Sequence, residues 1–192
     1  MKHIYTFLCL LLIGGVGQVG AFSEADLEKL KSTKECNKCD FSGANLGGAR
    51  LRGANLAEAN LTEAIFYRAN LTNAYLTGAN LYKANLEVVN RTGANLTGAN
   101  LIDAYREDTN LQEASLAGVD LTKAYLEATD LTGANLTMAN LTGAFLEGTN
   151  LENADLTDAV LTDAKLNWVK NLNKAILCRT AMPDATVDNS GC

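Results

Sequence analysis

The cysteines of this chain, and its shortage of histidine, limit the chemical reactions that it could carry out. After residue 21 the cysteines are Cys36, Cys39, Cys178 and Cys192, whereas the one histidine is His3. Histidine is the commonest general acid/base and metal ligand near neutral pH, so its absence argues against most hydrolytic and metal-dependent chemistry. The stretch Cys36-Asn37-Lys38-Cys39 has the spacing of a thioredoxin-type redox pair, which normally opens a helix in a βαβ unit. This motif has two interpretations, a redox dithiol and a structural bridge.

A five-residue repeat specifies the elements that position these side chains. From Phe41 to Leu166 the fifth-residue slot occurs 26 times, and leucine fills 22 of these slots. The exceptions are Phe41, Phe66, Arg91 and Arg106. Alanine stands two residues before the slot in 20 cases, and asparagine or aspartate usually lies between them. Residues two apart point the same way only in an extended chain, so we expect alanine and leucine to face inward and Asn/Asp outward.

The unit A-[ND]-L-x-x closely resembles that of the pentapeptide-repeat family, over most of the chain after residue 21. This resemblance implies an all-β fold, a right-handed quadrilateral β-helix with one pentapeptide per side and 20 residues per coil. Residues that replace the inward alanine support a 20-residue coil, because four of them lie 20 apart: Val89, Thr109, Thr129 and Thr149. We interpret the threonines as β-branched packing variants. The 26 units make 6.5 coils, a rod on the order of 30 Å long.

The two ends of the chain depart from the repeat. Residues 1–21 place Lys2 before an apolar run and end in small residues at Ala21, which predicts a secretory signal peptide. We expect no stable membrane anchor, because the apolar run is shorter than the roughly 20 residues of a spanning helix. The predicted boundaries are a signal peptide at 1–21, an N-terminal cap at 22–38, the pentapeptide-repeat β-helix at 39–177 and a C-terminal disulfide-bearing tail at 178–192.

Local signals refine these ends. Ser23, followed three residues later by Asp26, has the layout of a capping box, which predicts a short helix that plugs the first coil. The leucine register slips by one residue after Leu166, and we expect the extra residue within 167–170. Both cysteine-containing flanks resemble those of exported bacterial members of the family, in which a glycine is expected where this tail has Ala185.

The implied rod also restricts the cysteine pairing. A disulfide requires Cα atoms within about 7 Å, and the two ends of such a rod lie several times farther apart. We therefore expect Cys36 to pair with Cys39 and Cys178 with Cys192. Because the C-x-x-C motif follows a helix and enters a coil, we favour a structural bridge over a redox dithiol.

One side of the coil differs from the other three; its core slots are residues 46, 66, 86, 106, 126, 146 and 166, and it is called the aromatic side here. Aromatic residues precede its slots and glutamates follow them. The candidate interaction strip on this side comprises Tyr105, Arg106, Tyr125, Phe145, Glu107, Glu127 and Glu147. The aromatics are either a partner surface or packing that stabilises the solenoid.

The charged residues of the rod lead to specific structural expectations. A guanidinium among leucines would cost several kcal/mol, so we expect Arg106 to swing outward toward the glutamates or Tyr125. We expect Arg91, on the neighbouring side, to distort the same region; the alternative is that both arginines are tolerated defects. The glutamates should form a solvated ladder without a metal site. Residues of alternating sign are expected to form surface ion pairs: Glu63, Lys83, Asp103 and Lys123.

These features favour a non-catalytic, exported interaction or scaffold protein, periplasmic or extracellular, or in the thylakoid lumen of a photosynthetic organism. After residue 21 the chain has 15 Lys and Arg against 22 Asp and Glu, a net charge of −7, which disfavours binding to nucleic acid. We expect no cofactor, a protein partner of unknown identity and, as a further expectation, a homodimer. The alternative is a DNA mimic like some cytosolic members of the family, which bind gyrase; the predicted signal peptide argues against it.

Overall fold

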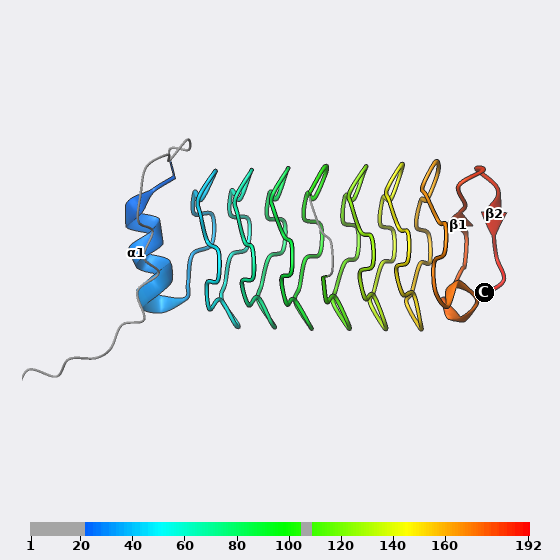
Figure 1. Ribbon diagram of the computed structural model, residues 1–192, viewed down its shortest axis with the longest axis horizontal. Helices are drawn as coiled ribbons and strands as arrows, with labels where there is room; N and C mark the ends of the chain where they lie inside the picture. The colour runs from blue at the N-terminus through cyan, green and yellow to red at the C-terminus, as the bar shows by residue number, and fades with distance from the viewer. Residues whose placement is uncertain (1–21, 105–108) are drawn as a thin grey trace, which may run out of the picture.

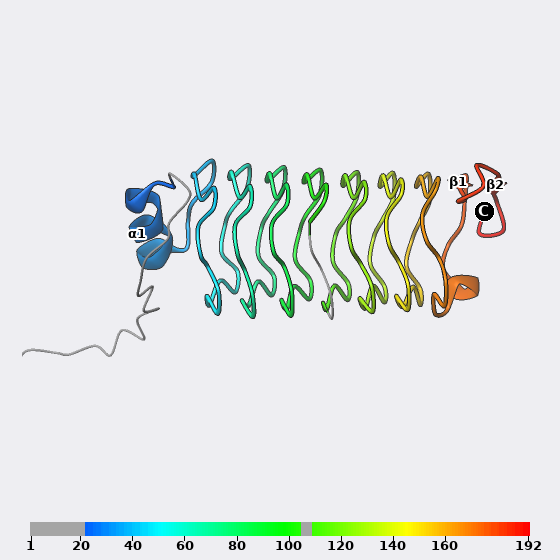
Figure 2. The ribbon, with the colours of Figure 1, turned by 45° about the horizontal axis from the view of Figure 1, so that its top comes forward.

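The protein is a rod of stacked four-sided coils with a helix at one end and a small hairpin at the other (Figure 1). The computed structural model describes residues 22–104 and 109–192. Its elements are α1 (Glu24–Thr33), η1 (Leu172–Lys174), β1 (Thr180–Ala181) and β2 (Val187–Asp188). Single-residue parallel bridges join positions 20 apart, from Glu35↔Asn55 to Asn150↔Lys170. The coils therefore stack in register, with corners aligned along the rod (Figure 2).

Each side of a coil repeats one pattern of backbone hydrogen bonds. Leu56 N donates to Tyr75 O in the next coil at 2.7 Å, and Asn55 N donates to Lys34 O in the previous coil at 2.8 Å. At the corners, the asparagine side chain accepts from the backbone two residues on, as Asn70 Oδ1 does from Thr72 N at 3.0 Å. The chain thus turns every five residues while its backbone polar groups are satisfied, as a buried solenoid requires.

The interior is filled by the alanines and core-slot residues that the repeat predicts. Phe41 and Phe66 are 0% exposed, as are most of the leucines. The inward threonines form the predicted row along the rod, but they are more than packing variants. Thr109 Oγ1 donates to Leu86 O at 3.1 Å, and Thr149 Oγ1 donates to Leu126 O at 2.6 Å. The hydroxyls therefore add polar contacts between successive coils inside the rod.

Arg91 fills its core slot with the side chain inside the coil. It is 0% exposed, and within the described part of the chain none of its Nε, Nη1 and Nη2 atoms has a hydrogen-bond partner. The backbone at Arg91 itself is regular, because Arg91 N donates to Asn110 O at 3.0 Å and Arg91 O accepts from Ala94 N at 2.8 Å. The part of the expected distortion around Arg106 lies outside the described residues. The regular backbone bonds hold this position inward, and burial lowers the pKa of Arg91 to about 9.

Helix α1 covers the first coil, as predicted. Ser23 Oγ accepts from Asp26 N at 3.2 Å, and Leu30 is buried against the coil. The predicted capping box is incomplete, because Asp26 does not reach back to Ser23. Its Oδ2 instead accepts from Asp40 N at 2.9 Å, while Ser23 N donates to Asp40 O at 3.1 Å. Asp26 therefore fastens the helix to the first coil. No helix in the described ranges has the length and apolar character to span a membrane.

The one-residue insertion lies later than predicted. Lys170 still pairs with Asn150, 20 residues earlier, whereas Ile176 pairs with Asp155, 21 residues earlier. The extra residue is therefore accommodated at 171–175, where Asn171 adopts a left-handed conformation (φ 57°) and η1 follows. In the tail, Ala185 occupies the position expected for glycine with φ 63°, and its N–H donates to Met182 O at 2.9 Å. The turn thus forms without glycine.

Candidate functional site

Tyr125 and Phe145 form a stacked pair on the aromatic side of the rod. Their ring centroids are 4.8 Å apart and the planes differ by 6°. The pairing follows from the coil, because Tyr125 and Phe145 are bridge partners in adjacent coils, and Phe145 pairs onward with Lys165. Both rings are half-buried. Of the remaining strip residues, Glu127 and Glu147 lie on this side, whereas Tyr105, Arg106 and Glu107 fall outside the described residues, as does the expected outward turn of Arg106.

The structure adds apolar residues to the aromatic side that the sequence interpretation missed. Among the described residues, nine large apolar side chains are exposed, and four of them lie on this side: Ile65, Tyr67, Val88 and Trp168. Trp168 is the most exposed of all, at 85%. The other five are divided among two other sides and the tail: Tyr75, Met138, Val160, Ile176 and Val187. Their positions relative to the core slots could have placed the four on this side from the sequence.

Charges on the aromatic side are mixed. The Arg68 guanidinium lies over the Tyr67 ring, 5.0 Å from its centroid. The glutamate ladder is less solvated than expected, because Glu147 Oε2 is shielded from solvent and accepts no hydrogen bond within the described part of the protein. This surface thus presents aromatic rings flanked by carboxylates, with cations toward its two ends at Arg68 and Lys165.

The column of alternating charge does not form the expected ion pairs. No contact between Glu63, Lys83, Asp103 and Lys123 is among the salt bridges of residues 22–104 and 109–192. Lys83 Nζ instead lies 5.1 Å from the Tyr82 ring centroid. The pKa of Lys83 is raised, chiefly by its interaction with Tyr82, with smaller contributions from Asp103 and Glu63. The Lys83 ammonium group therefore lies beside the aromatic ring of its own turn rather than beside the carboxylates of adjacent coils.

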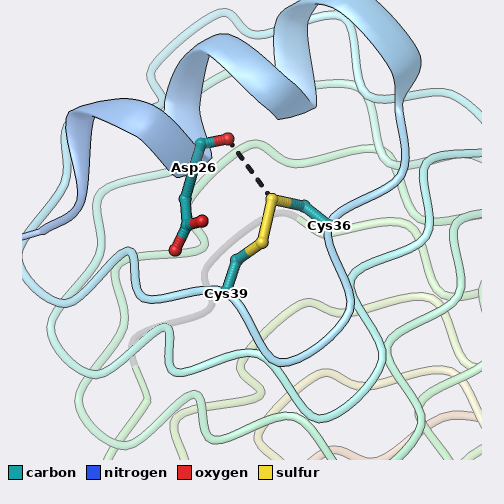
Figure 3. Close-up of side chains that lie close together, drawn as sticks. All are labelled: Asp26, Cys36 and Cys39. Carbon is teal, nitrogen blue, oxygen red and sulfur yellow. Dashed lines mark hydrogen bonds between the residues drawn. A yellow bond between two sulfur atoms is a disulfide. The ribbon is translucent and has the colours of Figure 1, made fainter.

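The N-terminal disulfide joins Cys36 to Cys39 where α1 gives way to the first coil, as predicted. Both cysteines are buried, and Cys36 Sγ lies 3.3 Å from Asp26 O (Figure 3). Asp26, Cys36 and Cys39 are also the one group of close metal-ligand types within the described ranges. Because the two sulfurs are bonded to each other, neither is a thiolate available to a metal. The motif is therefore a structural bridge in this structure.

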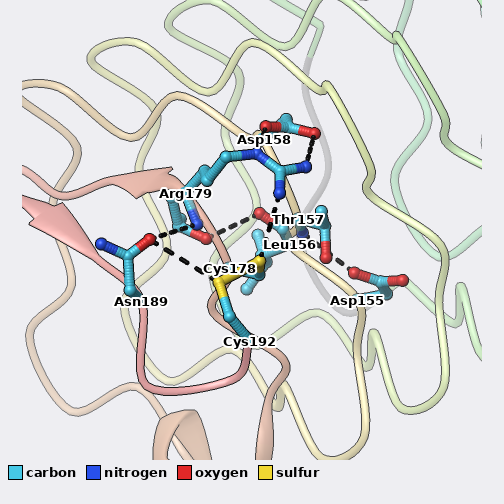
Figure 4. Close-up of polar contacts among 9 residues, drawn as sticks. Asp155, Leu156, Thr157, Asp158, Cys178, Arg179, Asn189 and Cys192 are labelled. Atoms are coloured by element: carbon cyan, nitrogen blue, oxygen red, sulfur yellow. Dashed lines mark hydrogen bonds and ion pairs between the residues drawn. A yellow bond between two sulfur atoms is a disulfide. The ribbon is translucent and has the colours of Figure 1, made fainter.

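The C-terminal disulfide joins Cys178 to Cys192, as predicted, within a polar cluster (Figure 4). Arg179 makes a bidentate contact with Asp158, with Nε and Nη2 each 2.6 Å from a carboxylate oxygen. This contact holds the pKa of Asp158 below its usual value. Sequence interpretation missed this pair, although Asp158 and Arg179 both lie two residues after a core slot, Leu156 and Leu177, once the one-residue slip is counted. An open depression of about 530 Å³ beside the tail is lined equally by apolar residues, such as Leu177 and Met182, and by polar residues, such as Asp188.

Stacked coils with one turn every five residues define a β-solenoid. The family profile described as pentapeptide repeats matches in eight copies, over residues 39–78, 69–105, 109–148 and 134–170. The chain belongs to the pentapeptide-repeat family, and the predicted right-handed quadrilateral β-helix is confirmed. A search of curated proteins finds no match.

Solved structures of the family are similar to this chain. A trypsin-treated form of QnrB1, a plasmid-mediated fluoroquinolone resistance protein, is 27% identical with a TM-score of 0.52 and covers 72% of this chain and 77% of its own. HetL, involved in heterocyst differentiation regulation in Nostoc sp. strain PCC 7120, is 32% identical with coverages of 80% and 83% and a TM-score of 0.28. A pentapeptide repeat protein from the Arabidopsis thaliana thylakoid lumen is 28% identical, with coverages of 69% and 72% and a TM-score of 0.35.

Proposed function

We propose that this protein is an exported, non-catalytic scaffold that binds a protein partner through its aromatic side. The observation that carries the proposal is the stacked pair Tyr125–Phe145 on the side that also bears the exposed Trp168. Aromatic residues and arginine are enriched where protein interfaces concentrate their binding energy. A flat row of rings with cations toward its ends provides both apolar area and orientation for a partner.

Export is supported by the two disulfides. Disulfides persist in oxidising compartments and are rare in the cytosol, so both bridges favour the periplasm, the extracellular space or a comparable lumen. The predicted signal peptide at residues 1–21 has the same implication. The two features are independent, because one concerns the N-terminal sequence and the other concerns the fold.

Catalysis and DNA mimicry are less well supported than scaffolding. The candidate strip lies on a flat side of a rod, whereas active sites are usually concave. DNA mimicry calls for continuous rows of negative charge, but Lys83 and Lys123 interrupt one acidic column, and Arg68 and Lys165 lie on the aromatic side. A scaffold role requires neither a pocket nor a uniform charge.

The test replaces Tyr125 and Phe145 together with asparagine, the residue that Asn45 and Asn85 supply at the same position in other coils. Proximity labelling in the native cell and the melting temperature are both measured. Loss of labelled partners with an unchanged melting temperature supports the interface. Unchanged partners with a lower melting temperature would reduce the pair to packing, which contributes roughly 0.5–1 kcal/mol.

The matched control is Tyr75→Asn, which removes an exposed tyrosine from the same repeat position on another side. It should leave the partners unchanged. Sedimentation of the purified protein tests a second copy as the partner: a dimer that the double variant dissociates and the control preserves would identify self-association through the aromatic side.

A further inference from the structure

The two disulfides differ in their access to solvent. Cys36 is 0% and Cys39 is 4% exposed, so the N-terminal bridge is sealed between α1 and the first coil. In the C-terminal bridge, Cys178 is half-exposed and Cys192 is exposed. Thiol–disulfide exchange requires a thiolate to reach a sulfur directly. A reductant therefore has access to Cys192 while the N-terminal bridge is protected.

Polar neighbours make the two sulfurs of the C-terminal bridge unequal (Figure 4). Arg179 Nη1 lies 3.6 Å from Cys178 Sγ, where its positive charge stabilises a thiolate. Cys192 Sγ lies 3.6 Å from Asn189 Oδ1, which carries partial negative charge. The Asn189 orientation is fixed, because Oδ1 also accepts from Arg179 N at 3.1 Å. Attack at Cys192 with departure of Cys178 is therefore the favoured direction.

Residues 178–183 continue the coil, since Ala181 N donates to Ala159 O at 2.9 Å and Asp163 N donates to Pro183 O at 3.0 Å. Beyond Pro183, few contacts other than the disulfide hold residues 184–192 to the rod. No residue from 181 to 192 is fully buried. β2 pairs with β1 over only two residue pairs, Thr180↔Asp188 and Ala181↔Val187, and Gly191 N donates to Leu177 O at 2.9 Å. A disulfide restricts the chain between its two cysteines, so the segment gains fewer conformations when it separates from the rod. The bridge is therefore a large part of what keeps residues 184–192 docked.

We propose that the Cys178–Cys192 bridge is a site of reversible reduction by a dithiol, and that its reduction releases residues 184–192 from the last coil. A thiolate of the dithiol attacks Cys192 Sγ, forming a mixed disulfide while the Cys178–Cys192 bond breaks and Cys178 leaves as a thiolate beside Arg179. The second thiol of the reductant then displaces Cys192. Two electrons pass to the protein, the two protons of the dithiol end on its cysteines, and the reductant becomes a disulfide. Leu177 and Thr180, buried in the oxidised form, lose their cover.

The first test is a dithiothreitol titration of the folded protein, followed by alkylation and peptide mass spectrometry. Cys178 and Cys192 should be alkylated at a reductant concentration at least tenfold below that needed for Cys36 and Cys39. Hydrogen exchange should then increase in residues 184–192 and remain unchanged in residues 41–165. Simultaneous reduction of both bridges, or a tail that stays protected after reduction, overturns the proposal. The double variant Cys178→Ser/Cys192→Ser should show the exposed tail without any reductant.

A second test separates the charge of Arg179 from its structural contact with Asp158. Arg179→Gln should slow reduction of the bridge several-fold, and Arg179→Lys should restore part of the rate because it keeps a cation. The matched control, Asp158→Asn, loses the ionic contact but retains the guanidinium, so its rate should stay close to that of the parent protein. Equal slowing in Arg179→Gln and Asp158→Asn, or faster reduction in Arg179→Gln, would refute the assigned direction of attack.

Discussion

Thr149 Oγ1 donates a 2.6 Å hydrogen bond to Leu126 O inside the rod, so one carbonyl serves two coils. The same oxygen accepts from Thr129 N at 3.1 Å. Thr149→Val, which keeps the shape, should lower the free energy of unfolding by about 1 kcal/mol, because the acceptor retains one partner and escapes the full cost of an unmade bond. Chemical denaturation measures the change.

The reverse substitution is the control for this row. Val89 occupies the equivalent position 60 residues earlier, and the 23-residue offset between Thr149 and Leu126 places Phe66 O as the acceptor for a hydroxyl there. Val89→Thr should therefore be close to neutral, although it buries a polar group. A large loss of stability in Val89→Thr would show that the threonine hydroxyls do not follow the geometry of the coil.

Backbone strain at Val88 gives a second prediction. Val88 has φ 55°, a left-handed conformation that is unfavourable for a β-branched residue, at a turn where glycine is common. Val88→Gly should raise the free energy of unfolding by about 1 kcal/mol. Gly98→Val is the converse variant: a Cβ there meets nothing within 4 Å, so its destabilisation would come from φ 64° rather than from a collision. Equal stabilities of parent and variants would contradict the strain at these corners.

The repeat predicted the coil well because one residue type at each slot determines which way the chain faces. The position of the insertion could not be predicted, since the register of Leu177 is the same wherever the extra residue lies between Leu166 and Leu177. Hydrogen bonding to the previous coil decides it, through the left-handed Asn171. The contact between Arg179 and Asp158 does not depend on that position, because each residue lies two positions after a core leucine, Leu177 and Leu156. For Arg91 the sequence revealed that a charged side chain occupies a core slot. It did not reveal whether the side chain stays inside the coil, because that depends on the strength of the surrounding backbone hydrogen bonds.

Gly191 is required by a close backbone approach. A Cβ added there would lie 2.5 Å from Leu177 N and 3.1 Å from Ile176 C. Since backbone atoms cannot move aside as a flexible side chain can, Gly191→Ala should lift the end of the tail and hinder closure of the C-terminal disulfide. After oxidative refolding, alkylation should find free thiol at Cys178 and Cys192 in this variant. The neighbouring exposed substitution Ser190→Ala should close the bridge normally; equal closure in both variants would rule out the collision.

The last prediction concerns the buried guanidinium. Arg91→Leu restores the common core residue and removes a charge without hydrogen-bond partners in the described structure, so the free energy of unfolding should rise by several kcal/mol. The alternative outcome is that the leucine is strained in this position and raises the free energy of unfolding by less. Arg52→Leu, on the exposed part of the same side, is the matched control and should change stability little.

The pH dependence of this gain distinguishes charge from shape. Burial lowers the pKa of Arg91 from its usual, much higher value to about 9, so above pH 9 the folded protein loses a proton that the unfolded chain retains. The free-energy penalty of the buried charge is therefore complete below pH 9 and shrinks as the pH rises above 9. The stability difference between Arg91→Leu and the parent should be constant from pH 6 to 8 and narrow by about 2 kcal/mol at pH 10.5.

The other titrating groups are common to both proteins, so their contributions to this difference cancel. A difference that stays constant through pH 10.5, as expected for Arg52→Leu, would show that Arg91 remains charged in the folded rod.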